Sequence, residues 1–177
     1  MSDDLDLSGY SVPEEGENAP QGLYARLVAT CDELVHLKEQ EPAVLILFRN
    51  FEKSKNGKLV LGSCCQPSVQ GELKPMFEWL MVERFGFFPD YLILLDRAFW
   101  DSADDRTREV LLFHELMHTE QATDKYGAPK FDRDTGAPVW SIRGHDLEEF
   151  NDVVRRYGAW SGDVERFIEA ESLTVSP

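Results

Sequence analysis

Three residues in one short segment have the types and the spacing of a metal site that acts on water. His114, Glu115 and His118 follow the order His-Glu-x-x-His within residues 110–118, VLLFHELMH. Residues four apart on an α-helix lie on one face about 6 Å apart, so both imidazoles can point at one ion. Zinc suits this arrangement because it binds histidine nitrogen, and the neighbouring carboxylate then lies beside a coordination position that holds water. The spacing predicts a helix that carries two metal ligands and a general base.

The residues around this motif are almost all apolar, which predicts a helix buried on nearly every side. They are Val110, Leu111, Leu112, Phe113, Leu116 and Met117. Residues 102–105 resemble a capping box, so we expect the helix to begin there and to continue to about Thr123. Burial of imidazoles and a carboxylate without partners costs several kcal/mol, and coordination of an ion explains how this cost is avoided.

A catalytic zinc ion normally has three protein ligands and one open position. His145 is the leading candidate for the third ligand, because it follows a glycine and opens the next predicted helix. A carboxylate of Glu148 or Glu149 is the alternative. Asp124 is less favoured, because a helix that continues past His118 carries it away from the ion. His36, the remaining histidine, is expected to be a surface imidazole outside the site.

Apolar periodicity predicts the elements that must position the motif. Helices are expected over 20–41, 75–88, 146–157 and 162–173, although the aromatic residues of 75–88 also suit a strand. Strands are expected over 43–48, 58–61 and 91–95. The Asn56-Gly57 pair predicts a hairpin between the first two strands, and residues 131–142 predict a second hairpin. Cys64 and Cys65 then fall in a loop, and inert thiols are favoured because no basic cluster is apparent beside them. These elements predict an α+β fold, with a small mixed sheet packed against helices.

Composition limits the classes of partner and compartment. The 177 residues include 33 acidic and 18 basic side chains, a formal net charge of −15, so no direct nucleic-acid binding is expected. Residues 1–19 are acidic and predict a flexible tail, and residues 20–177 predict a single domain. Three cysteines cannot pair evenly, and neither a signal peptide nor a membrane span is apparent. We therefore expect a cytoplasmic protein that contacts no membrane.

The segment FHELMHTEQ followed by RGHDLEEF resembles the SprT-like and phage-type putative metallopeptidases, over roughly residues 91–158. The resemblance implies a minimal zincin-like domain with Zn²⁺ as cofactor and a protein or peptide as substrate, in the host cytoplasm if a phage encodes it. It also implies that His114, His118 and His145 bind the metal and that Glu115 is the general base. The chain departs from SprT-like proteins in the spacing after His145, and it lacks a cysteine-rich zinc ribbon, so their DNA-linked substrates are not carried over.

Two other functions are compatible with the same sequence. One is a non-catalytic protein that keeps zinc for structure, and the other is an acidic DNA mimic that binds and inhibits a host protein. For a peptidase, the extended segments 91–95 and 139–142 are candidate edges for a peptide, although Trp140 is also a candidate core residue. Tyr126 and Tyr157 are candidate phenols for an oxyanion, although packing or surface roles are favoured for both. The substrate and the oligomeric state are not encoded in any pattern of the sequence.

Overall fold

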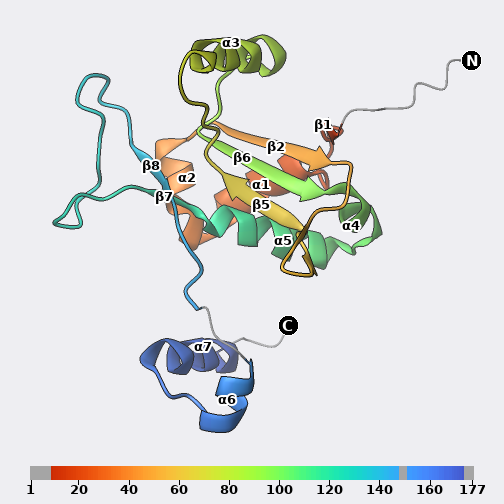
Figure 1. Ribbon diagram of the computed structural model, residues 1–177, viewed down its shortest axis with the longest axis vertical. Coiled ribbons are helices and arrows are strands. Elements are labelled where there is room, and N and C mark those ends of the chain that lie inside the picture. Colours follow the sequence, from red (N-terminus) through yellow and green to blue (C-terminus); the bar gives the residue numbers. More distant parts are fainter. Residues whose placement is uncertain (1–8, 148–150, 174–177) are drawn as a thin grey trace, which may run out of the picture. The chain divides into compact units, whose positions relative to one another are not determined.

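Two apolar segments of the sequence form the parallel centre of a mixed β-sheet. The computed structural model describes residues 9–147 and 151–173. Strand β2 (Val44–Arg49) pairs in parallel with β6 (Tyr91–Asp96), and Arg49 lies opposite Asp96 at their carboxyl ends. Strand β5 (Gly62–Cys65) runs antiparallel to β6, and β1 (Tyr10–Ser11) runs antiparallel to β2. The strand order is therefore β1-β2-β6-β5 (Figure 1).

The strand pairing corrects two predictions. The Asn56-Gly57 turn joins β3 (Ser54–Lys55) to β4 (Lys58–Leu59) in a small sheet of their own, so the predicted hairpin between 43–48 and 58–61 is wrong. Both turn residues have positive φ, 52° and 74°, as a tight two-residue hairpin requires. The predicted loop at Cys64 and Cys65 is wrong as well, because these residues belong to β5. Strand β2 is apolar along most of its length and suits the centre of a sheet, where both faces are covered.

The first helical region is interrupted where the sequence predicts one continuous helix over 20–41. Helix α1 (Pro20–Thr30) ends at Cys31, which is extended with φ −99° and ψ 120°. A 3₁₀ turn, η1 (Asp32–Leu34), and helix α2 (Val35–Gln40) follow. After this break Leu34 and Leu37 are both buried. The interruption thus redirects the chain while its leucines stay in the core.

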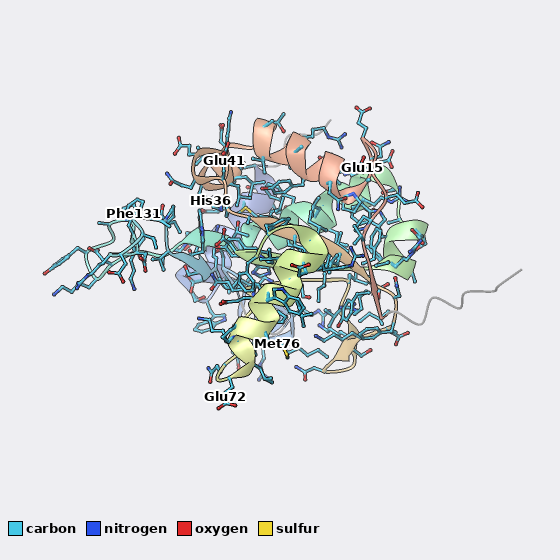
Figure 2. All side chains as sticks on the ribbon, turned by 90° about the horizontal axis from the view of Figure 1, so that it is seen from above. Glu15, His36, Glu41, Glu72, Met76 and Phe131 are labelled. Atoms are coloured by element: carbon cyan, nitrogen blue, oxygen red, sulfur yellow. The ribbon has the colours of Figure 1, made fainter. Side chains whose placement is uncertain are left out.

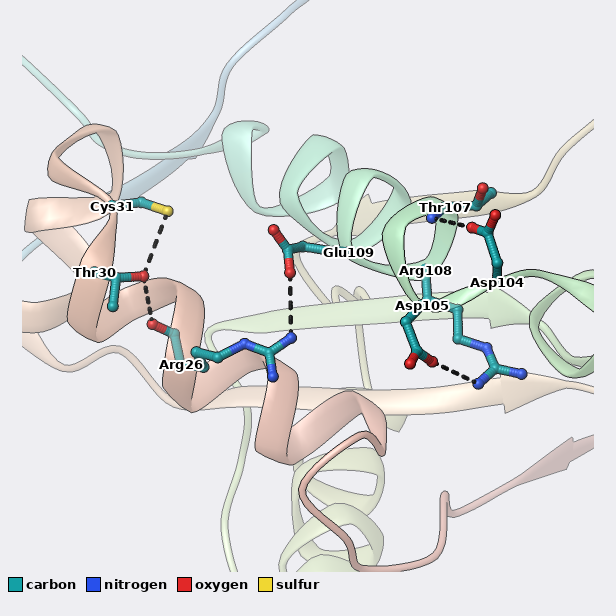
Figure 3. Close-up of polar contacts among 8 residues, drawn as sticks. All are labelled: Arg26, Thr30, Cys31, Asp104, Asp105, Thr107, Arg108 and Glu109. Carbon is teal, nitrogen blue, oxygen red and sulfur yellow. Dashed lines mark hydrogen bonds and ion pairs between the residues drawn. The ribbon is translucent and has the colours of Figure 1, made fainter. Parts of the chain in front are cut away.

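One face of the sheet packs against helices α1, α2 and α5 (Asp105–Met117), as Figure 1 shows. Their apolar side chains form one buried cluster: Leu23, Leu27, Leu34, Leu37, Ile46, Phe48, Ile93, Leu95, Trp100, Leu112 and Leu116. An exposed ion pair between Arg26 and Glu109, 3.2 Å long, also joins α1 to α5 (Figure 3). Because α5 carries the His-Glu-x-x-His motif, this core fixes the motif against the sheet.

Two further helices flank strand β6 in the sequence. Helix α3 (Leu73–Phe85) confirms the helix predicted over 75–88, and none of its residues is buried. Met76, labelled in Figure 2, is 50% exposed. Helix α4 (Arg97–Ser102) begins directly after β6, and its N-cap residue Asp96 accepts a hydrogen bond from the backbone N–H of Phe99 at 2.9 Å. Together with the mixed sheet, these helices confirm the predicted α+β fold class.

The chain divides into two compact units, residues 1–143 and 144–177. The second unit contains helix α6 (Asn151–Tyr157) and helix α7 (Gly162–Ser172). Helix α7 begins at the predicted residue and ends one residue before the predicted end. It is capped by the Ser161 hydroxyl, which accepts from the Val164 N–H. In the predicted tail over 1–19, Tyr10 and Ser11 pair with β2. The prediction of a single domain over 20–177 stays a prediction.

Among the described residues, no helix combines the length and the apolar character that a membrane crossing requires.

Helix α5 is buried on one side only, which corrects the predicted burial on nearly every side. Leu112 and Leu116 are 0% exposed, whereas Val110 is 60% exposed. The polar residues at the start of α5, together with Val110, face solvent, and one stripe alone enters the core. Asp104 is the N-cap residue, with its carboxylate accepting from the Thr107 N–H at 2.7 Å, so the helix begins two residues later than predicted (Figure 3).

The one-sided burial of α5 predicts different costs for two truncations on the same helix. Leu112→Ala should lower the free energy of unfolding by about 2–5 kcal/mol, because it leaves a cavity in the core. Val110→Ala is the matched control, and it should change the free energy by about 0.5 kcal/mol or less. Denaturant unfolding followed by circular dichroism measures both. Equal costs for the two variants would contradict this packing.

Candidate metal centre

The motif helix ends at the motif itself. Helix α5 carries His114 and Glu115 and ends at Met117, and His118 is its C-cap residue. The prediction that the helix continues to about Thr123 is wrong, because Thr119 begins strand β7 (Thr119–Gln121), which pairs with β8 (Trp140–Ile142). The Thr119 hydroxyl donates to the Leu116 carbonyl oxygen at 2.6 Å, satisfying an acceptor of the last helical turn.

The two histidine rings of the motif lie together at this helix end. Their centroids are 5.1 Å apart and the ring planes meet at 83°. One nitrogen of the His114 ring lies within 4.8 Å of one nitrogen of the His118 ring. His114 is exposed and His118 is half-buried, so the predicted deep burial holds for neither ring. The pair is reachable from solvent and close enough to share an ion.

A backbone carbonyl fixes the orientation of the His118 ring. Its Nδ1 lies 2.7 Å from the Arg143 carbonyl oxygen. A carbonyl oxygen only accepts, so Nδ1 carries the hydrogen and Nε2 carries the lone pair. Histidines that bind metals are oriented in the same way by carbonyl oxygens or carboxylates. In the opposite direction, the Arg143 N–H donates to the His118 carbonyl oxygen at 2.8 Å.

The β7–β8 pair that presents Arg143 is fastened to the sheet by Tyr91. The Tyr91 hydroxyl lies 2.9 Å from the Glu120 carbonyl oxygen and 2.8 Å from the Ser141 carbonyl oxygen. The Trp140 ring contacts the Tyr91 ring edge to face, with centroids 5.9 Å apart. Residues 139–142 were predicted to pair with 131–136, but β8 pairs with β7, and only a bridge between Phe131 and Pro138 remains of that hairpin. Phe131 lies in the projecting loop between the two strands (Figure 2).

Glu115 is the one motif residue that is buried, with 4% of its surface exposed. It faces strand β5, where a Cβ built on Gly62 would overlap its Oε1. Burial raises the pKa of Glu115 from 4.5 to about 7, while nearby His118 and a hydrogen bond to the Cys64 backbone act in the opposite direction. A carboxyl group with a pKa near neutrality can both take up and release a proton at physiological pH.

Gly62 is a residue of this site that sequence reasoning missed. A side chain at this position would meet the Glu115 carboxylate, so β5 can approach α5 only because the residue is glycine. Gly62 directly follows the strand predicted over 58–61, and a glycine at that place is the available signal, but the strand β5 that begins there is not predicted. Next to it, burial raises the pKa of the Cys64 thiol to about 12 and also raises that of Cys65. Both thiols are therefore poor nucleophiles, as predicted.

His36 is not the surface imidazole that the sequence predicts. It lies on α2 and is labelled in Figure 2, and its Nε2 is 2.8 Å from the Thr119 hydroxyl oxygen. Because that hydroxyl donates to Leu116, it accepts from the His36 Nε2–H. Partial burial lowers the pKa of His36, which favours the neutral ring. His36 thus supports the residue that follows His118.

The other predicted site residues have different outcomes. His145 is the second residue of the second unit, two positions after Arg143. Asp124 caps a turn, with its carboxylate accepting from the N–H groups of Tyr126 and Ala128 at 2.8 and 3.0 Å. Tyr126 is 81% exposed and Tyr157 is 64% exposed, so neither is packed in the core. Glu148 and Glu149 lie outside the described residues.

A cavity of about 450 Å³ borders the motif within the first unit, and its lining includes His114, Glu115, Gly62, Leu61 and Phe99. It brings a carboxylate of raised proton affinity beside an imidazole, with strand β5 along one side. This arrangement can hold a divalent cation through ring nitrogens and move a proton at the Glu115 carboxylate.

Comparison with known proteins agrees with this chemistry. The chain matches the model of a family described as "Putative phage metallopeptidase" over residues 15–171. No curated protein and no solved structure matches the chain. The match confirms the resemblance to phage-type metallopeptidases, and a metallopeptidase family implies a metal ion and a protein or peptide substrate. Since the match covers most of its length, the chain belongs to the family of putative phage metallopeptidases.

Proposed function

We propose that this protein is a zinc-dependent peptidase in which His114, His118 and His145 bind the ion and Glu115 is the general base. The observation that carries the proposal is that one helix end places an oriented His118 ring beside the buried carboxyl group of Glu115. The carbonyl of Arg143 leaves the Nε2 of His118 as the lone-pair nitrogen, and Glu115 one turn away is held against β5 with a raised pKa. Carboxyl groups with strongly shifted pKa values are concentrated at functional sites.

The residues fit a zinc ion by their chemistry. Each of the three histidines offers one ring nitrogen, and imidazole nitrogen is a preferred ligand of Zn²⁺. Three histidines leave one of the four positions of a tetrahedral ion open, which is the difference between a catalytic site and a closed structural one. A fourth protein ligand would instead favour the non-catalytic alternative.

The covalent chain supports His145 as the third ligand. The Arg143 carbonyl oxygen is 2.7 Å from the His118 ring, and His145 follows Arg143 by two residues. Two extended residues span at most about 7 Å. His145 is therefore tethered within reach of an ion at His118 whatever orientation the rest of the second unit takes.

The catalytic step follows from the groups of the chain. A bound zinc ion supplies Lewis acidity that acidifies water and polarises the scissile carbonyl. With the ion bound, Glu115 would accept the proton of the attacking water and then donate it to the leaving amine. Gly62 leaves room for the carboxylate, and the backbone of β5 limits its movement.

The substrate is proposed to lie along β5. The sequence suggested 91–95 as a peptide edge, but β6 is flanked by β2 and β5 and offers none. Within the described chain, β5 pairs with β6 on one side and lies at the end of the sheet. An extended peptide can add to such an edge through main-chain hydrogen bonds. Its scissile bond would then pass Gly62 and Glu115.

Replacement of the proposed general base should separate catalysis from metal binding. Glu115→Gln should retain zinc and lose peptide hydrolysis by about 10²–10⁴-fold, since it removes the proton acceptor. Zinc analysis and cleavage of a casein or peptide-library substrate measure the two properties. Glu109→Gln, on the same helix, is the matched control and should keep both. Full hydrolysis by the Glu115 variant would contradict the proposed role.

The third ligand is tested by metal affinity. His145→Ala should weaken zinc binding by more than about tenfold, since even a group that only orients a ligand contributes that much. Asp124→Ala should leave the affinity unchanged, because that carboxylate caps a turn. Titration against a competing chelator measures both. An unchanged affinity in the His145 variant would remove it from the ligand set.

The raised pKa of Glu115 predicts a pH dependence of the metal-free protein. An acid whose pKa rises on folding, here from 4.5 to about 7, destabilises the folded state once it ionises. The free energy of unfolding should therefore fall as pH rises from about 4.5 to about 7, by the contribution of this group. Glu115→Gln should flatten this part of the profile. Urea unfolding of both proteins with chelator present measures it, and identical slopes would contradict the shift.

A further inference from the structure

A second cavity of the first unit lies at the carboxyl ends of the two parallel strands. Its volume is about 690 Å³, and it is lined by residues that follow β2 and β6 and by part of α4. Arg49, the last residue of β2, and Asp96, the last of β6, are both among them. Ligands of sheets with parallel strands commonly bind outside these strand ends.

Arg49 is buried in this cavity wall with one nitrogen unpaired. Its side chain is 1% exposed. Its Nε donates to the Phe51 carbonyl oxygen at 3.1 Å, and its Nη2 donates to Asp96 Oδ2 at 3.3 Å and also to the Val60 carbonyl oxygen. Within the described part of the chain, Nη1 has no hydrogen-bond partner. Nη1 itself is covered by the cavity wall, so an acceptor oxygen reaches it only when a neighbouring side chain moves aside, and the ligand then gains the hydrogen bond that this donor lacks.

Most other charged side chains of the cavity form hydrogen bonds or ion pairs within the protein. Asp96 Oδ1 accepts from the Phe99 N–H, and its Oδ2 accepts from Arg49. Arg97 lies 3.5 Å from Asp101, and Glu52 is exposed. The cavity thus holds no excess of positive charge, and its specificity comes from a directed donor rather than from a general attraction for anions.

Apolar side chains connect this cavity to the proposed catalytic groove. Leu59, Leu61 and Phe99 line both cavities. Along the main chain, Val60 accepts from Arg49, and Gly62, two residues later, lies against Glu115. Two residues span at most about 7 Å, so the residue that accepts from Arg49 and the glycine beside the proposed general base lie within that distance of each other.

We propose that this cavity is a substrate subsite for a side chain with an apolar stem and a terminal carboxyl or carboxamide oxygen, bound by Arg49 Nη1. Glutamate and glutamine have this form. The stem would contact Leu59, Leu61 and Phe99, and the terminal oxygen would accept the unused hydrogen bond. The subsite rests on the proposed function, since it names the substrate class of that same site.

Binding of short peptides tests the subsite without hydrolysis. The full-length Glu115→Gln protein is titrated with acetyl-Ala-Ala-X-Ala-Ala-amide, where X is glutamate, glutamine or methionine, by calorimetry. At least one of the polar peptides should bind at least about tenfold more tightly than the methionine peptide. The methionine side chain has a similar length but no oxygen that accepts a hydrogen bond. The glutamate and glutamine arms show whether the acceptor is charged. Equal binding of all three peptides would overturn the subsite.

Variants assign the preference to this cavity. Arg49→Lys keeps the charge but lacks Nη1. Ala98→Trp fills the cavity from an exposed position of α4 and leaves Arg49 itself unchanged. Both should abolish the preference, whereas Ala25→Trp, on the exposed face of α1, should keep it. A preference that survives Ala98→Trp would overturn the subsite even if Arg49→Lys failed to fold. The peptide titrations are carried out with and without zinc. Peptide preference can therefore be measured even if the protein binds no zinc and hydrolyses no peptide, so failure of the proposed function and failure of the subsite are distinguishable.

Discussion

The hydrogen bond between the His118 ring and the Arg143 carbonyl oxygen is the constraint on which the rest of the site depends. It exists because α5 ends at the motif and the chain turns at once into β7, which β8 then accompanies back to the helix end. Tyr91 holds both strands through their carbonyl oxygens, and the His36–Thr119 contact holds the first residue of β7. The ring of His118 is therefore oriented by backbone that side chains of β6 and α2 fix in place.

The position of Glu115 depends on the close packing of β5 against α5. Strand β5 lies against α5 at Gly62, and the missing side chain there leaves room for Glu115. The same packing removes the carboxyl group from water and raises its pKa. A carboxyl group with a pKa near neutrality thus results from the contact between a strand and a helix, and the histidines beside it need not be buried for this purpose.

The two cavities of the first unit share this strand and its preceding turn. The main chain from Leu59 to Gly62 borders Arg49 at one end and Glu115 at the other. The Val60 carbonyl oxygen in this segment accepts from Arg49, and Gly62 leaves room for Glu115, the proposed base. This arrangement explains why a short, half-exposed edge strand contains a glycine and why a buried arginine lies at the end of β2.

The sequence by itself determined the chemistry and most of the regular elements. The spacing of His114, Glu115 and His118 required only a helix, and the apolar runs at β2 and β6 and the periodicity of α3 and α7 were sufficient to predict them. The Asn56-Gly57 turn was equally local, since its positive φ angles are a property of those two residues. The resemblance to phage-type metallopeptidases came from this motif and the segment around His145, and the family match over residues 15–171 confirms it.

Tertiary structure decided where the motif helix ends, which of its sides is buried, and which strand adjoins it. The end at His118 depends on pairing between β7 and β8, about twenty residues apart, which no local pattern in α5 reveals. The roles of Gly62, His36 and Arg49 depend on contacts across long separations in sequence. Apolar residue types show only that a segment can be buried; which side is buried depends on the partner that packs against it.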